Sequence, residues 1–351
     1  MASKNRISVG AIEIGDGSPI SVQTMTNTNT EDVRATLAQI DRAKSAGCDL
    51  IRISCPTKDS TIALREILRS DQKIPIIADI HFDYRRAIEA IEAGVHGIRI
   101  NPGNIDSTAL QEIVKALKNA DCALRIGVNS GSIERDILDK YREPTAEALV
   151  ESAVLNCRKL EDLDFTRVKV SVKSSNVRTS VTAYRMLSQS IDYPLHVGIT
   201  EAGTCFPGTI KSAVGIGSLL LDGIGDTIRV SLSGDIAEEV KVGRQILKSL
   251  GLLAGSIDIV SCPTCSRTLI DVIGLSKALE EYCENIYLNM KISILGCVVN
   301  GPGEASNSDI GIFGFKKGHA KVFVSGKELG IFEENRLLDL MMGIVINLKS
   351  S

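Results

Sequence analysis

The chain has 351 residues, with 40 lysines and arginines against 43 aspartates and glutamates, so its formal net charge is −3. Hydrophobic residues make up 44% and charged residues 24% of the sequence, which is typical of a folded globular protein and excludes a disordered chain. The near-neutral charge, the lack of an apolar run of roughly 18 residues and the lack of an apolar signal sequence in MASKNRISVG predict a cytoplasmic protein that binds neither nucleic acid nor membrane.

Short apolar runs alternate with segments of helical periodicity from residue 19 to about residue 250. In the segment 32–47, for example, Val33, Leu37 and Ile40 share one helical face. The strict order of strands and helices predicts a closed (β/α)8 barrel, whose usual size is about 250 residues, with an open doubly wound sheet as the alternative. The eight predicted strands are 19–25, 49–55, 75–82, 97–104, 123–129, 167–173, 194–200 and 227–233.

Six of these strands alternate apolar and polar residues. Successive side chains of a strand point to opposite faces, so the apolar face would meet the helices and the polar face would point into the barrel. The barrel interior would then carry cations where branched apolar residues are usual. The side chains predicted to point inward are those of Arg52, Arg99, Arg125, Lys169, Lys173, His196 and Arg229.

Three interpretations of these cations remain open. They could belong to solvated faces of an antiparallel sheet, although the intervening helical segments favour parallel strands. They could form an internal salt-bridge network with Asp79. We favour an anion site, because arginine matches phosphate oxygens bidentately and converging cations at a barrel mouth suit a diphosphate. Neither a Walker A sequence nor a GxGxxG motif occurs, so a nucleotide-binding loop does not explain them.

The sequence changes character after Leu250, where a glycine-containing link leads into a short strand and the motif CPTC at 262–265. A helical stretch and the strand KISILGCVVN follow, so we predict a barrel domain over 1–252 and a small α+β domain over 253–351. The remainder predicts a strand at 321–324 and a terminal helix at 333–348.

Three cysteines of the second domain occupy positions typical of metal ligands. Cys262 and Cys265 form a Cys-x2-Cys pair, and Cys297 follows at the end of a strand. The nine cysteines of a chain without a secretory signal predict reduced thiols or metal ligands rather than disulfides. Zinc would need a fourth ligand, for which His319 and Cys283 are candidates.

Three thiolates with one weaker oxygen ligand would instead suit a [4Fe-4S] cluster that has one exchangeable iron. Glu304, in a Gly-Pro-Gly-Glu turn, is a candidate for that ligand, and an ordinary loop carboxylate is the alternative. The other six cysteines are scattered singly, as is typical of small buried residues, and Cys55 and Cys205 receive no role.

Nine distinctive segments follow one another along almost the whole chain. They are SVQTMTNTNTEDV (21–33), ADIHFDYR (78–85), RINPGNI (99–105), RIGVNSGS (125–132), KVSVKSS (169–175), GITEAG (198–203), GIGDTIRVSLS (223–233), CPTCSR (262–267) and GCVVNGPGEA (296–305). In these segments the chain resembles the 4-hydroxy-3-methylbut-2-enyl diphosphate synthases of the bacterial methylerythritol phosphate route to isoprenoids. The resemblance implies a TIM barrel followed by a small iron–sulfur domain. It also implies reductive ring opening and dehydration of 2-C-methyl-D-erythritol 2,4-cyclodiphosphate.

The resemblance further implies the residues of the site. A [4Fe-4S] cluster would be held by Cys262, Cys265, Cys297 and Glu304, and Glu201 matches a proposed acid–base residue. The segment GTCFPG at 203–208 departs from the Gly/Ala-rich form expected of the family, which leaves the local shape of the barrel mouth open. The substrate-binding candidates at the mouth are Arg52, Arg99, Arg125, Asn129, Lys173, Arg229 and Ser231, with Asp79 and His81 in a further matching motif.

The same resemblance implies partners. Reduced flavodoxin or ferredoxin would donate electrons, and the chain would form a homodimer in which one subunit's cluster domain closes over the other's barrel. Two other interpretations stay open on the residues alone. One is a zinc-stabilised protein with a phosphate-binding barrel, and the other is a pterin-type barrel synthase, which would have no use for the cysteine domain.

Overall fold

The computed structural model describes residues 3–70, 72–284 and 286–349. The chain divides into two compact units, a barrel unit, Met1–Leu252, and a C-terminal unit, Leu253–Ser351. Across the described ranges, no helix is both long enough and apolar enough to cross a membrane. Each unit is described by itself.

Eight parallel strands form the barrel unit in the order β8-β7-β6-β5-β4-β3-β10-β9, and a parallel bridge between Val170 and Leu195 joins the two edges. The predicted (β/α)8 barrel is therefore confirmed. Several strands are shorter than predicted, because the residues at their carboxyl ends continue into the loops of the mouth. The strands are β3 Ser21–Met25, β4 Leu50–Ser54, β5 Ile76–Asp79, β6 Gly97–Ile100, β7 Ala123–Asn129, β8 Val168–Lys173, β9 His196–Val197 and β10 Thr227–Ile228.

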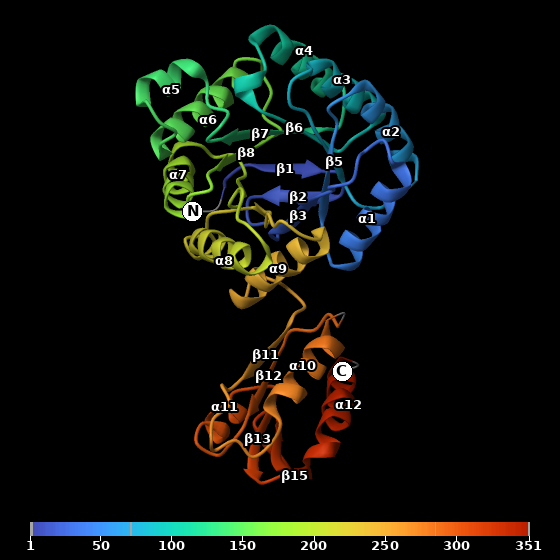
Figure 1. Cartoon of the computed structure of the whole chain (residues 1–351), viewed down its shortest axis with the longest axis vertical. Helices are drawn as coiled ribbons and strands as arrows, with labels where there is room; N and C mark the ends of the chain where they lie inside the picture. The colour runs from blue at the N-terminus through green and yellow to red at the C-terminus, as the bar shows by residue number, and fades with distance from the viewer. Residues whose placement is uncertain (1–2, 71, 285, 350–351) are drawn as a thin grey trace. The chain divides into compact units, whose positions relative to one another are not determined.

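Helices surround these strands (Figure 1), and most of them begin at a side-chain cap. Thr57 caps α2 through a reciprocal capping box with Ser60, and Thr145 caps α6. An additional short helix, α5, precedes α6 and ends at Arg142, whose φ of 64° is left-handed. The helices are α1 Val33–Ser45, α2 Lys58–Arg69, α3 Tyr84–Ala93, α4 Ser107–Lys118, α5 Arg135–Tyr141, α6 Ala146–Glu161, α7 Val177–Ser190, α8 Cys205–Leu221 and α9 Ile236–Ser249.

A hairpin of β1 (Arg6–Val9) and β2 (Ile12–Gly15), which the sequence analysis missed, precedes the barrel. Its Val9 and Ile14 belong to a buried cluster with residues near the amino ends of the barrel strands, including Leu50. The hairpin therefore closes the amino-terminal end of the barrel with an apolar layer, and the polar residues of the interior lie toward the other end.

The C-terminal unit is a five-stranded sheet in the order β11-β12-β13-β14-β15, in which β11, β12 and β13 are parallel and β14 and β15 continue as an antiparallel meander. Its α10 and α12 contribute Leu279 and Val345 to a core with Ile292 and Ile312 of the sheet. The elements are β11 Ile257–Ser261, α10 Val272–Cys283, β12 Met290–Leu295, α11 Gly301–Ser306, β13 Ile310–Lys316, β14 His319–Val324, β15 Lys327–Glu333 and α12 Leu337–Lys349.

Two sequence predictions for this unit need correction. The terminal helix begins at Leu337 rather than at residue 333, because residues 327–333 pair with β14 as a further strand. The strands β13 and β15 were not predicted, since their glycines, Gly311 and Gly330 among them, interrupt the apolar alternation that marks a strand.

Candidate active site

The cations predicted to point inward do line the barrel interior. Arg99 lies opposite Arg125 in the register of β6 and β7, and Arg125 lies opposite Lys169 in that of β7 and β8. Register partners in neighbouring strands point the same way, so these three side chains form one cationic layer. All the predicted inward cations except Arg229, whose side chain is 17% exposed, are buried.

Two buried carboxylates hold part of this cluster. Asp79 accepts a hydrogen bond of 3.1 Å from Arg99 Nη1 and lies 3.6 Å from Arg52 Nε. Burial raises the pKa of Asp79, but the neighbouring Arg52 and Arg99 outweigh burial and hold it at about 2. Glu239 lies 3.5 Å from Arg229 Nη2. The salt-bridge network considered as an alternative is thus present, but it covers only some of the cations.

The remaining cations have no carboxylate partner. Arg125, Lys169 and Lys173 form no ion pair with any described residue, and Arg125 Nε, Arg125 Nη1 and Lys169 Nζ are buried without a hydrogen-bond partner there. Burial, reinforced by the other cations of the interior, lowers the pKa of all three well below the ordinary value. Buried donors without acceptors are costly, so this interior is suited to an anionic ligand that brings its own oxygens.

Two interior glycines make room for the cations. A Cβ on Gly127 would lie 2.6 Å from Arg99 Nε, and a Cβ on Gly198 would lie 2.9 Å from Lys173 Nζ and 2.4 Å from the Arg229 carbonyl oxygen. Neither contact is tolerable without movement of the neighbour, so these positions keep the interior open around the charged groups.

Other candidates lie around the same interior. His81 Nε2 is 3.3 Å from Arg99 Nη1 and 3.7 Å from Asp79 Oδ2, which joins it to the Asp79 network. Asn129 lies opposite Lys173 in the register, and Ser231 is half-buried two residues beyond Arg229. The structure therefore places these predicted residues at the carboxyl end of the barrel, where TIM-barrel enzymes bind substrate.

Glu201 lies in an exposed turn beyond β9, three residues before Thr204, the residue that directly precedes α8. Its φ of 52° is left-handed, which is uncommon for a residue other than glycine and is often found at functional sites. Because Glu201 precedes the helix, a role as a carboxylate in the first helical turn does not explain its position.

Sequence reasoning missed Glu239, which belongs to α9 and not to an alternating strand. Its carboxylate accepts hydrogen bonds from Thr24 Oγ1 at 2.6 Å and from the Leu232 N–H at 2.9 Å, so it ties α9 to β3 and to the loop after β10. Asn101 was also missed. It is 5% exposed, its Oδ1 has no partner among the described residues, and it continues the alternation of Arg99, which could have revealed it.

The candidate cluster ligands lie in the C-terminal unit. Cys262 follows β11 and Cys297 follows β12, and because these neighbouring strands are parallel, both cysteines lie at the same end of the sheet. The Gly296 N–H donates a hydrogen bond of 3.1 Å to Cys262 Sγ, which brings the two cysteine loops into contact. Cys265 is exposed. Within the described ranges, no three histidine, cysteine or acidic side chains lie close enough together to hold a metal ion.

Glu304 lies on α11, and its nearest charged partner is Lys291, with 3.5 Å between Glu304 Oε2 and Lys291 Nζ. Cys283, considered as a zinc ligand, is buried at the end of α10. This end of α10 leads to the start of β12, whereas Cys262 follows the carboxyl end of the neighbouring parallel strand β11, so Cys283 is remote from Cys262. The donor set fits an iron–sulfur cluster, because it has three thiols from two adjoining loops and a backbone N–H already directed at a sulfur.

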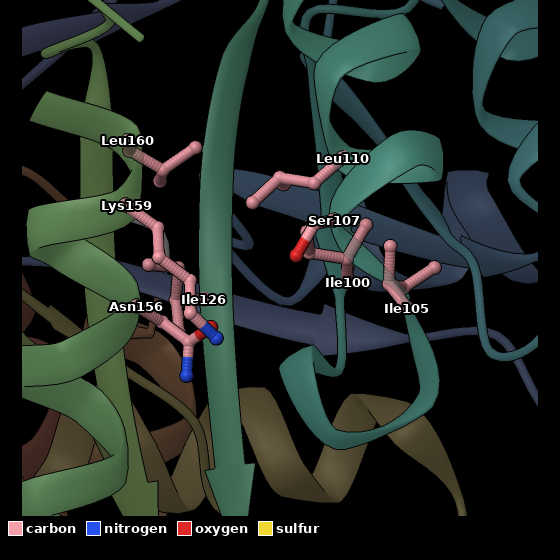
Figure 2. Close-up of a pocket in the computed structure, with 8 residues that line it drawn as sticks. All are labelled: Ile100, Ile105, Ser107, Leu110, Ile126, Asn156, Lys159 and Leu160. Atoms are coloured by element: carbon pink, nitrogen blue, oxygen red, sulfur yellow. The ribbon is translucent and has the colours of Figure 1, made fainter. Parts of the chain in front are cut away.

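A small crevice outside the barrel contains none of the predicted site residues (Figure 2). Ile126, Leu110 and Leu160 line it between α4 and α6, with Lys159 and Asn156 on one side. With about 20 Å³ available, it has room for little more than one water molecule. We assign it no role.

Comparison with known proteins covers almost the whole chain. Residues 4–244 match the model of the GcpE TIM-barrel domain, and residues 258–347 match that of the GcpE protein C-terminal domain. A 4-hydroxy-3-methylbut-2-en-1-yl diphosphate synthase (flavodoxin) of Zymomonas mobilis is 52% identical over 97% of this chain and 90% of its own length. The protein of the same name from Clostridium acetobutylicum is 49% identical over 98% of both chains.

Among solved structures, dihydropteroate synthase of Thermus thermophilus superposes with a TM-score of 0.49 and 12% identity, covering 71% of this chain and 99% of its own. A likeness at this level bears on neither substrate nor chemistry.

Proposed function

The chain belongs to the GcpE family, and we infer that its reaction is the one after which its relatives are named. In that reaction 2-C-methyl-D-erythritol 2,4-cyclodiphosphate takes up two electrons and two protons and gives 4-hydroxy-3-methylbut-2-enyl diphosphate and one water. Two C–O bonds break, one opening the ring and one releasing the hydroxyl, and one C=C bond forms. Neither alternative, the zinc-stabilised binding protein or the pterin-type synthase, is supported.

One observation carries the assignment of the substrate site. Six cations of the barrel interior face two carboxylates, Asp79 and Glu239, and several of their donors have no acceptor among the described residues. We propose that the substrate diphosphate supplies those acceptors. The bound oxygens would be held by Arg52, Arg99, Arg125, Lys173 and Arg229, with Asn129, Ser231 and His81 at the rim. Cations fixed in this way also stabilise the diphosphate oxygen as it leaves the ring carbon.

Glu201 would donate the proton that lets the substrate hydroxyl leave as water. Its exposed position in a strained turn at the carboxyl end of the barrel supports this role, because a proton donor must exchange its proton with solvent between turnovers. Asp79 is the less suitable donor, since Arg52 and Arg99 keep its pKa at about 2 and therefore keep it ionised.

Cys262, Cys265, Cys297 and Glu304 would hold a [4Fe-4S] cluster in the C-terminal unit. Such a cluster, when bound, supplies electrons one at a time. Glu304 would have to leave Lys291 to serve as a ligand, and a carboxylate is a weaker cluster ligand than a thiolate. The proposal also includes flavodoxin or ferredoxin as the electron donor, a homodimeric assembly and a cytoplasmic location.

The proposal is tested by anaerobic turnover of the cyclodiphosphate with a chemical reductant, on protein whose iron, sulfide and zinc have been measured. We expect about four irons and four sulfides per chain and formation of the open-chain diphosphate. Stoichiometric zinc, or a cluster-containing protein that leaves the cyclodiphosphate intact, would refute it. Light scattering that gives twice the chain mass would support the homodimer.

A further inference from the structure

An exposed cationic turn adjoins the cysteine loops of the C-terminal unit. The strands β11, β12 and β13 are parallel, so their carboxyl ends lie together. Cys262 follows the first strand, Cys297 follows the second, and Lys316 ends the third. The turn to β14 continues with Lys317 and with Gly318, whose φ of 70° lets the chain reverse direction at this edge.

Backbone hydrogen bonds fix this turn against the cysteine loops. The Gly318 N–H donates to the Leu269 carbonyl at 2.9 Å, and the Leu269 N–H donates to the Gly296 carbonyl at 2.8 Å. The Thr268 N–H donates to the Cys265 carbonyl at 3.0 Å. The cationic turn, the segment after the Cys-x2-Cys motif and the loop that carries Cys297 are therefore one connected surface.

The cations of this surface are not neutralised within the described part of the chain. Arg267, Lys316 and Lys317 are all exposed, and none of them forms an ion pair with a described residue. Other lysines of the same sheet do, since Lys321 lies 3.1 Å from Glu328. A set of unpaired exposed cations on one connected surface is suited to a partner with carboxylates at matching positions.

Three acidic residues lie near the turn. Glu333 lies opposite His319 in the register, and Glu334 is engaged with the Asp271 N–H. None of the carboxylates of Asp271, Glu333 and Glu334 forms an ion pair with the cations of the turn among the described residues, so those cations stay available to a partner.

The surface also carries exposed apolar side chains. Val298 and Val299, directly after Cys297, are 48% and 62% exposed. A protein–protein interface combines apolar and polar side chains, and this surface offers both.

We propose that Arg267, Lys316, Lys317, Val298 and Val299 form the docking face for the electron-donor protein, whose contacting surface is rich in carboxylates. This rests on the proposed function, and the relatives' names specify flavodoxin as the donor. Each docking event transfers one electron, so the donor is oxidised by one electron and two events supply one turnover. Because the attraction is between exposed charges, docking weakens as salt is added.

The test is a double charge reversal, Lys316→Glu with Lys317→Glu, in the cluster-loaded full chain. We expect its Kd for oxidised flavodoxin, measured by calorimetry at low salt, to rise about 10-fold or more. We also expect the steep salt dependence of the Kd to flatten. Turnover with reduced methyl viologen, which needs no protein docking, stays at the wild-type rate.

Lys327→Glu is the matched control. Lys327 is exposed in the same sheet but lies at its opposite end, where β15 begins, so its reversal leaves the Kd unchanged. If the double variant loses iron, Lys317→Gln replaces it as the test. Its Kd should rise by less than that of the double reversal, because it removes one charge and reverses none.

Two outcomes would overturn the proposal: an unchanged Kd in the double variant, or an equal loss of affinity in Lys327→Glu. An unchanged Kd together with a changed oligomeric mass would show that a second copy of the chain covers this face. Failure of the wild-type chain to turn over with methyl viologen would refute the proposed function and leave the docking measurement intact.

Discussion

The barrel interior and the cysteine loops of the C-terminal unit differ in how much the protein chain organises by itself. In the barrel, Arg99 and Arg125 project from paired strands into buried positions, and Asp79 pairs with Arg99. In the C-terminal unit, Cys265 is exposed, and within the described ranges the cysteines do not lie close enough together to hold a metal ion. The chain alone fixes the positions of the interior cations, whereas the loops supply donors that a cluster would gather.

The difference has a physical cause. Strand backbones are fixed by ladders on both sides, so a charged side chain on a strand can be held in place even when its burial is unfavourable. Thiols on loops carry no such constraint, and a metal centre commonly contributes the free energy that orders its own ligands. Four substitutions test this contrast.

The largest effect is expected from Cys297→Ser. Loss of a thiolate should lower turnover by about 1,000-fold or more, beyond the roughly 10- to 100-fold typical of groups that only support a ligand. Iron content should fall while the affinity of the barrel for the cyclodiphosphate, measured by calorimetry, stays the same. Cys205→Ser, at an exposed cysteine of the barrel unit, is the control and should keep its iron. Normal iron in Cys297→Ser would contradict the ligand assignment.

Asp79→Asn should destabilise the barrel by about 3 kcal/mol, because it leaves Arg52 and Arg99 buried without their carboxylate. The pKa of Asp79 is about 2 in the folded chain against an ordinary 3.8, so its ionised form stabilises the fold above about pH 4. That contribution, about 2 kcal/mol, is lost as the pH falls from about 4 to 2.

Urea unfolding as a function of pH checks both parts of the Asp79 prediction. The difference between wild type and Asp79→Asn should shrink below about pH 4. Asp121→Asn, which breaks an exposed pair with Arg167, should cost less than about 1 kcal/mol at every pH. An equal loss of unfolding free energy in the two variants would show that the buried ion pairs of Asp79 stabilise the fold no more than an exposed pair does.

Arg125→Met should separate binding from stability. Removal of a guanidinium that contacts the diphosphate should weaken substrate binding by about 30-fold, in line with hydrogen bonds between charged groups. The same variant should unfold at an equal or higher temperature, because Arg125 is buried without a carboxylate partner among the described residues. Arg185→Met, on the exposed surface of α7, should leave binding unchanged. Unchanged binding in Arg125→Met would assign the interior cations a structural role.

The smallest effect is expected from Gly127→Ala. Its Cβ would lie 2.6 Å from Arg99 Nε, so the guanidinium must shift and substrate binding should weaken by about 5-fold, or about 1 kcal/mol. Gly131→Ala, where the added Cβ meets no atom within 4 Å, should bind as wild type does. Equal affinities for both variants would show that the interior tolerates displacement of its cations.

The sequence by itself determined the eight barrel strands and the inward direction of their cations. Side-chain direction in a strand follows from residue parity alone, and the alternation of Arg99 or Lys169 with branched apolar neighbours is unbroken. The positions of Cys262 and Cys297 at strand ends were likewise predictable, because each follows a short apolar run, whereas the pairing of the two strands was not.

Only the tertiary structure decided which groups meet across the chain. Glu239 reaches Arg229 and Thr24 because α9 packs beside β3, a contact between residues 215 positions apart that no local pattern records. Residues 6–15 form the hairpin of β1 and β2 because Val9 and Ile14 are buried against the barrel. The parity of a residue in its strand determines where its side chain points. The packing of distant segments determines which groups that side chain contacts, including the partners of a buried charge.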